Sequence, residues 1–166
     1  MWRPDRSVRG PDRPGYRDID PTEIPVVELP KGGRVRVIAG AVEVDGKSTR
    51  GPVEPGATDA LYLDVELPAG GGFSLPVPAD HNAFVYPYEG AVTIGEGEGA
   101  KVLDARSAGL LSDETRIVVN GGGEGARFLV LAAKPLKEPV VQYGSAHAED
   151  AMRAVPPGPA VGDDAG

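Results

Sequence analysis

Histidine and carboxylate side chains are the groups in this 166-residue chain with the chemistry to bind a metal or to transfer a proton. The chain has two histidines, His81 and His147. His81 follows Asp80. In one interpretation, His81 acts as a metal ligand or a general base beside that aspartate. Alternatively, it is a structural residue that hydrogen-bonds the entry to the next strand, because the following Asn82 suits a turn. The structural interpretation is favoured, so His81 is only a weak candidate metal ligand, and we predict no catalytic residue.

The glycine-rich segments and the serines do not complete a familiar catalytic or phosphate-binding motif. Gly95–Gly99 (GEGEG) lacks the lysine and the following serine or threonine of a phosphate loop, and its glutamates would repel phosphate. Gly121–Gly123 precedes no predicted helix, so both segments are interpreted as hairpin loops. No Gly-x-Ser-x-Gly motif occurs, and the chain has no cysteine. A nucleophilic elbow, a disulfide and a thiolate metal site are therefore excluded.

Charge and hydropathy narrow the possible partners and the location. The formal net charge of −8 argues against nucleic acid, whose phosphates require a basic protein face. The N-terminus lacks the apolar region of a secretory signal. The longest apolar run, Phe128–Ala133, is too short to span a bilayer. We therefore predict a cytoplasmic protein with neither a nucleic-acid nor a membrane partner.

The central part of the chain has the pattern of an all-β protein. In Leu61–Leu67 apolar residues alternate with polar ones, which is typical of a strand with one buried face. Glycine-rich turns separate many short segments of this kind, and such a pattern favours a single-domain sandwich or barrel. The predicted strands are Ile24–Leu29, Arg34–Ala39, Leu61–Leu67, Phe73–Leu75, Ala83–Tyr88, Ala91–Ile94, Lys101–Ala105, Arg116–Asn120, Arg127–Ala133 and Val140–Gln142.

Three aromatic residues share one face of the strand that ends at the Glu89–Gly90 turn. They are Phe84, Tyr86 and Tyr88, with Val85 on the opposite face. They could line a small apolar pocket, but aromatic residues at strand spacing more often belong to the core. We therefore expect them to face the core.

The two ends of the chain differ in composition from the centre. Residues 1–15 contain two Pro-Asp-Arg triplets and little that is apolar, so burial cannot offset the entropy of ordering them. We predict a disordered arm there, and its arginines are interpreted as solvated rather than as a site for an acidic partner. Residues 145–166 are predicted to form a short helical turn, within His147–Val155, and a disordered tail.

A series of segments carries a resemblance to a known family. In order, they are Arg34–Gly40 (RVRVIAG), Leu61–Val65 (LYLDV), His81–Tyr86 (HNAFVY), Ala126–Leu131 (ARFLVL) and Glu138–Gly144 (EPVVQYG). Together they resemble the C-terminal domain of the pirin family. This resemblance implies a cupin-like jelly-roll β-barrel over residues 16–144. It also implies that a second, N-terminal cupin barrel is missing from this chain.

The resemblance also bears on metal binding. In the family, an iron or another divalent metal is held in the N-terminal barrel by three histidines and one carboxylate. The first two form a His-x-His pair ahead of a strand that ends in a Glu-Gly turn. The corresponding place here reads Pro76-Val77-Pro78, and the later His-x-Glu pair has no counterpart near Asp113–Thr115. We therefore expect no cofactor in this chain.

Two functional hypotheses follow from the resemblance. The first is a metal-free, non-catalytic cupin domain with a structural or protein-interaction role. The alternative is one part of a quercetin 2,3-dioxygenase-like oxygenase whose catalytic barrel is absent from this chain. The missing ligand set favours the first, and so argues against an enzyme. Because the two barrels of a pirin pack together, we expect a homodimer or a separate cupin-domain partner.

Overall fold

Buried and more exposed residues alternate along the three longest strands of the computed structural model, because successive side chains of a strand point to opposite faces of the sheet. These strands are β5 (Leu61–Leu67), β7 (Asn82–Glu89) and β12 (Ala126–Ala133). The structure describes residues 17–111 and 115–137, and all its strands lie in the unit that ends at Pro135. The predicted arm (residues 1–15), the predicted tail (residues 145–166) and the predicted strand Val140–Gln142 lie outside the described residues.

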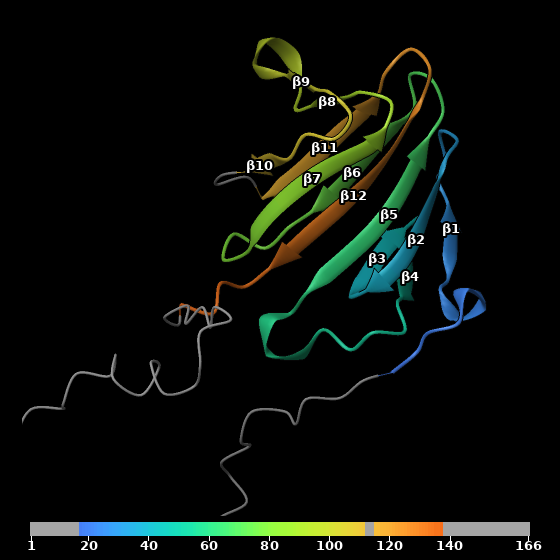
Figure 1. Ribbon diagram of the computed structural model, residues 1–166, viewed down its shortest axis with the longest axis vertical. Helices are drawn as coiled ribbons and strands as arrows, with labels where there is room; N and C mark the ends of the chain where they lie inside the picture. Colours follow the sequence, from blue (N-terminus) through green and yellow to red (C-terminus); the bar gives the residue numbers. More distant parts are fainter. Residues whose placement is uncertain (1–16, 112–114, 138–166) are drawn as a thin grey trace, which may run out of the picture. The chain divides into compact units, whose positions relative to one another are not determined.

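Two antiparallel sheets form the body of this unit (Figure 1). The larger sheet has the order β1-β2-β5-β12-β7-β10, in which β1 is Val26–Glu28, β2 is Arg34–Ala39 and β10 is Gly109–Leu111. The smaller has the order β6-β11-β8-β9, formed by Gly72–Pro76, Arg116–Gly121, Val92–Ile94 and Lys101–Leu103. Strands β3 (Ala41–Val44) and β4 (Lys47–Arg50) form a separate hairpin. Three short 3-10 helices are η1 (Pro21–Glu23), η2 (Gly56–Thr58) and η3 (Gly97–Gly99).

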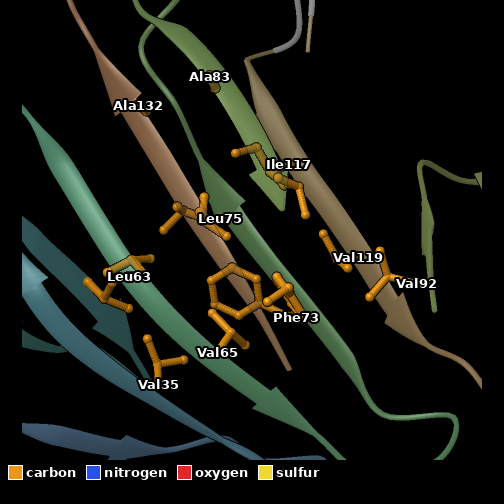
Figure 2. Close-up of a cluster of buried hydrophobic side chains, with 14 of the residues drawn as sticks. Val35, Leu63, Val65, Phe73, Leu75, Ala83, Val92, Ile117, Val119 and Ala132 are labelled. Carbon is orange, nitrogen blue, oxygen red and sulfur yellow. The ribbon is translucent and has the colours of Figure 1, made fainter. Parts of the chain in front are cut away.

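The hydrophobic core lies between the six-stranded and the four-stranded sheet (Figure 2). Leu63, Val65 and Phe128 contribute to it from the larger sheet, and Phe73 and Ile117 from the smaller. The ring of Phe73 meets that of Phe128 edge-on, with 6.3 Å between the ring centroids. Among the described residues, no polar or charged residue is classed as buried. The core between the two sheets is therefore formed by apolar side chains, and their burial is the main stabilising contribution to the fold.

The predicted all-β fold class is confirmed, and every predicted strand that falls on described residues is present. Three observed strands were not predicted, namely β3, β4 and β10. The β3–β4 hairpin turns at Asp45–Gly46, and both residues have positive φ (50° and 74°). Asp-Gly between alternating residues is a strong signal for such a two-residue turn, so this hairpin could have been predicted. Strand β10 has only three residues and follows no such turn signal.

Glycine is required at the predicted turn that joins β7 to β8. Gly90 has φ +70°, and a Cβ atom there would lie 2.3 Å from the carbonyl oxygen of Gly125. Both the backbone conformation and the close approach of the neighbouring chain therefore exclude a side chain. Within residues 17–111 and 115–137, no helix is long and apolar enough to cross a membrane.

Candidate functional site

Buried apolar residues alternate with the two prolines of the segment Pro76-Val77-Pro78, where the resemblance puts the first two histidine ligands. The side chains that point into the interior there are those of Leu75 and Val77, each residue 4% exposed, whereas Pro76 and Pro78 are exposed. Pro76 and Pro78, the positions compared with the histidines in the sequence, therefore face outward, and their neighbours Leu75 and Val77 face the interior. Neither Leu75 nor Val77 carries an atom that can bind a metal.

Strand β11 also contributes an apolar side chain to this region. The backbone N–H of Val77 donates to the carbonyl oxygen of Thr115 at 2.9 Å, which aligns the end of β6 with the start of β11. Ile117 then points inward and is 2% exposed, and Figure 2 shows it with Leu75 in the space between the sheets. Asp113 and Glu114 lie outside the described residues. Within the described part of the chain, no three His, Cys, Asp or Glu side chains are grouped so that they could hold a metal.

His81, the weak metal-ligand candidate, lies in the loop that leads into β7. Its side chain is only 3% exposed. Nδ1 lies 2.9 Å from Oδ1 of Asp80, and Nε2 lies 3.3 Å from the carbonyl oxygen of Asp59. Both ring nitrogens therefore face protein oxygen atoms. In this arrangement neither nitrogen is free to bind a metal, although the absence of a metal site in the whole chain stays a prediction.

The predicted aromatic face lies on the opposite side of the six-stranded sheet from the core. Along β7 the buried residues are Ala83, Val85 and Pro87, whereas Phe84, Tyr86 and Tyr88 are half-buried. The expectation that these aromatics face the core is therefore wrong. We call this side the outer face. It consists of the side chains of the six-stranded sheet that point away from the core, among them Val26, Arg34, Arg36, Tyr62, Asp64, Glu66, Phe84, Tyr86, Tyr88, Leu110, Arg127, Leu129 and Leu131.

One end of the outer face carries a row of alternating charges. Glu66 pairs with Arg34 and Arg127 in the register of the sheet. Arg34 donates from Nε and Nη2 to Oε2 of Glu66, at 3.0 and 2.7 Å. Arg127 lies 3.6 Å from Glu66 and 3.6 Å from Glu89. The hydrogen bond from Arg34 is the main reason that the pKa of Glu66 is lowered. This end also opens onto a cavity of about 500 Å³, whose lining includes Glu66, Glu89, Glu124 and Arg127.

A second group of polar side chains lies beside this row. Asp64 accepts a hydrogen bond from the hydroxyl of Tyr88 at 2.7 Å and pairs with Arg36 at 3.1 Å. Burial and then the hydrogen bond to Asp64 raise the pKa of Tyr88 to about 12. The guanidinium of Arg127 lies 5.6 Å from the centre of the Tyr88 ring, which is a cation–π distance. Tyr88 therefore connects the two groups of charges.

The other end of the outer face is apolar. In the sheet register Leu131 lies between Tyr62 and Phe84, and Leu110 lies opposite Phe84. Leu110 is 85% exposed, so its side chain is open to solvent in the single chain. The outer face therefore combines an apolar end with a charge-paired end.

Comparison with known proteins determines the family. Residues 62–148 match the Pirin C-terminal cupin domain. The chain belongs to the pirin family. It is 43% identical over 131 residues to a Pseudomonas aeruginosa protein provisionally named quercetin 2,3-dioxygenase. That match covers 78% of this chain and 45% of the relative.

Other pirin-family proteins give the same result. Human pirin is 31% identical over 147 residues, which cover 87% of this chain and 48% of that protein. The crystal structure of a quercetin 2,3-dioxygenase from Acinetobacter baumannii superimposes with a TM-score of 0.68 and 29% identity. That match covers 84% of this chain and 47% of the other. The cupin fold is thus established, and the chain spans about half the length of the curated relatives it matches.

Proposed function

We propose that this chain is a pirin-family cupin domain that binds no metal, catalyses no reaction and serves a structural or protein-interaction role. The observation that supports this most is that Leu75, Val77 and Ile117, around the segment Pro76-Val77-Pro78, are buried and apolar. Iron needs several nitrogen or oxygen ligands around a position left open for substrate. Hydrocarbon side chains supply none of these ligands.

A second candidate function is favoured by the comparisons themselves. A structurally similar protein is a quercetin 2,3-dioxygenase, and this chain covers only 47% of it. In this alternative, the chain is one half of an oxygenase whose catalytic barrel is supplied separately. Catalysis would then require that second barrel, and the present domain would act by supporting it.

Metal analysis combined with an oxygen-consumption assay tests the proposal. We expect the purified chain to contain no stoichiometric iron, nickel or zinc, and to consume no oxygen with quercetin. The quercetin 2,3-dioxygenase from Acinetobacter baumannii serves as the positive control. One tightly bound ion per chain that survives His81→Ala would contradict our account of the interior. Loss of that ion in His81→Ala would instead identify His81 as a ligand.

For the interaction role, we propose that the outer face contacts a second copy of this chain. The described ion pairs of this face join three arginines (Arg34, Arg36, Arg127) to three acids (Asp64, Glu66, Glu89). A two-fold contact places the same patch on both sides, so a patch that carries equal numbers of both charges can meet its own copy without net repulsion. The exposed Leu110 beside Phe84 provides apolar surface for the same contact. A specific interface of this kind buries on the order of 1,000 Å² or more in total.

Sedimentation equilibrium at micromolar concentration tests this contact. We expect the wild-type chain to form a dimer and Leu110→Lys to weaken it, because a buried ammonium is costly. Val102→Lys is the matched control, since Val102 is 70% exposed on β9 of the other sheet. Equal dimerisation of both variants would exclude the outer face. A wild-type monomer that associates only with the N-terminal half of the Pseudomonas aeruginosa relative would support the separate cupin-domain partner instead.

A further inference from the structure

The register of the six-stranded sheet brings three separate segments together at one end. Leu61, the first residue of β5, pairs with Ala132, and Asn82, the first residue of β7, pairs with Ala133. The residues just before β5 and β7 and just after β12 must therefore be neighbours. The charged or titratable residues at these places are Asp59, Asp80, His81 and Lys134.

The imidazole of His81 lies between two of these segments. Its side chain is 3% exposed, whereas the side chains of Asp59 and Asp80 are mostly exposed. Nδ1 is 2.9 Å from Oδ1 of Asp80. Nε2 is 3.3 Å from the carbonyl oxygen of Asp59 and 3.5 Å from its Oδ2. The ring thus connects the loop before β7 to the loop before β5.

When the aspartates are ionised, each of these oxygen atoms can accept a hydrogen bond but cannot donate one. A carboxylate and a carbonyl have no proton to donate. Neutral imidazole carries one N–H, so its other nitrogen would direct a lone pair at an oxygen atom. Only the doubly protonated imidazolium donates to both sides. The contacts of His81 are therefore fully satisfied only when the ring is charged.

We infer that protonated His81 forms a proton-dependent clasp that fastens the loops before β5 and β7 at this end of the sheet. Two further contacts connect β12 to the clasp. The backbone N–H of Lys134 donates to the carbonyl oxygen of Thr58 at 2.8 Å, and Nζ of Lys134 lies 3.7 Å from Asp80. Asp59 is held in the left-handed region (φ 49°, ψ 47°), a conformation that aspartate tolerates better than most residues. This inference does not depend on the proposed function.

The clasp has a defined direction of response to pH. Loss of one imidazolium proton as the pH rises leaves a nitrogen facing an acceptor, so the clasp opens toward alkaline pH. On the acid side the hydrogen bond from His81 is the main cause that lowers the pKa of Asp80. Asp80 therefore stays ionised and keeps its hydrogen bond to His81 until the pH falls through that lowered pKa. Among the described residues, Asp59, Asp80 and Lys134 are the charged groups that surround the ring through these contacts.

Nuclear magnetic resonance on the full-length chain tests the clasp directly. Solvent-exposed imidazole N–H protons exchange too fast to be seen, whereas hydrogen-bonded and buried ones are retained. At pH 5.5 we expect ring N–H signals from both nitrogens of His81, assigned by their disappearance in His81→Asn. A single ring N–H signal from His81, or the signature of a neutral ring at this pH, would overturn the inference.

Hydrogen exchange of the backbone gives a second readout. Between pH 5.5 and pH 9, after correction for intrinsic exchange, we expect the amide of Lys134 to lose about tenfold in protection, the effect of one charge-assisted hydrogen bond. The amide of Val130, in the centre of β12, should keep its protection. In Asp80→Asn, which keeps an acceptor but removes its charge, the pH dependence should shrink. If the protection of Lys134 is the same at both pH values in the wild-type chain, the clasp does not exist.

Discussion

The two faces of the six-stranded sheet are built from the same strands but differ in chemistry. Toward the core, Val65, Val85, Phe128 and Val130 are fully buried and apolar. On the outer face, the residues between them form ion pairs, a tyrosine–carboxylate hydrogen bond and an apolar end. The inner face therefore contributes hydrophobic burial, whereas the outer face carries the paired charges.

Among the variants that compare the two faces, truncation of a core side chain should cause the largest loss of stability. Phe128→Ala removes a fully buried ring that packs edge-on against Phe73. We expect it to lower the free energy of unfolding by about 3–5 kcal/mol, as large-to-alanine changes in cores do. Chemical denaturation followed by circular dichroism measures this. Leu129→Ala, the next residue on the outer face, is the matched control and should cost clearly less. Equal losses would show that the outer face is covered as fully as the core.

Removal of the central acid of the charge row should have an intermediate effect. Glu66→Gln leaves Arg34 and Arg127 without their shared carboxylate. Because these side chains are partly exposed, we expect a loss of about 1 kcal/mol or less, reduced by salt. The exposed Glu43 on β3 provides the control variant Glu43→Gln, which should be near neutral.

The pH dependence of the same variant sharpens the test. The pKa of Glu66 is lowered in the fold, so its contribution is present above the ordinary value of a glutamate and is lost as the pH falls through the lowered pKa. The stability difference between wild type and Glu66→Gln should therefore disappear in acid. A difference that persists in strong acid would mean that packing, and not the ion pair, is responsible.

The smallest effect is expected for Tyr88→Phe. The pKa of Tyr88 is raised from 10.0 to about 12, so the neutral phenol is favoured in the folded state. Its contribution is fully present below pH 10 and is lost as the pH rises from 10 toward 12. Wild-type stability should fall more steeply over this interval than that of Tyr88→Phe, measured by denaturation at a series of pH values. Tyr86→Phe, on the same face, should retain the wild-type slope. If Tyr88→Phe also retains it, the hydrogen bond to Asp64 does not contribute.

Local patterns in the sequence predicted the elements well but not the orientation of one of them. The alternation in Leu61–Leu67 predicts a half-buried strand, and β5 has those bounds. Alternation also shows that Phe84, Tyr86 and Tyr88 share a face. It cannot show which face is inward, and the larger aromatics suggested the wrong one. Pairing across the sheet decides this, because Val85 lies opposite the buried Val130 of β12.

What the sequence determined by itself is therefore the family and the strand pattern, since each depends on residue types at short spacing, whereas the missing ligand pair stays a prediction. The tertiary structure alone decided that Leu75 and Val77 face inward in place of Pro76 and Pro78. It also brought His81 against Asp59, which lies 22 residues earlier in the chain. The physical reason is that sheet register sets both the direction of a side chain and its distant neighbours. A shift of register by one residue would turn every side chain of a strand to the other face, and the partners of a strand lie far from it in the chain.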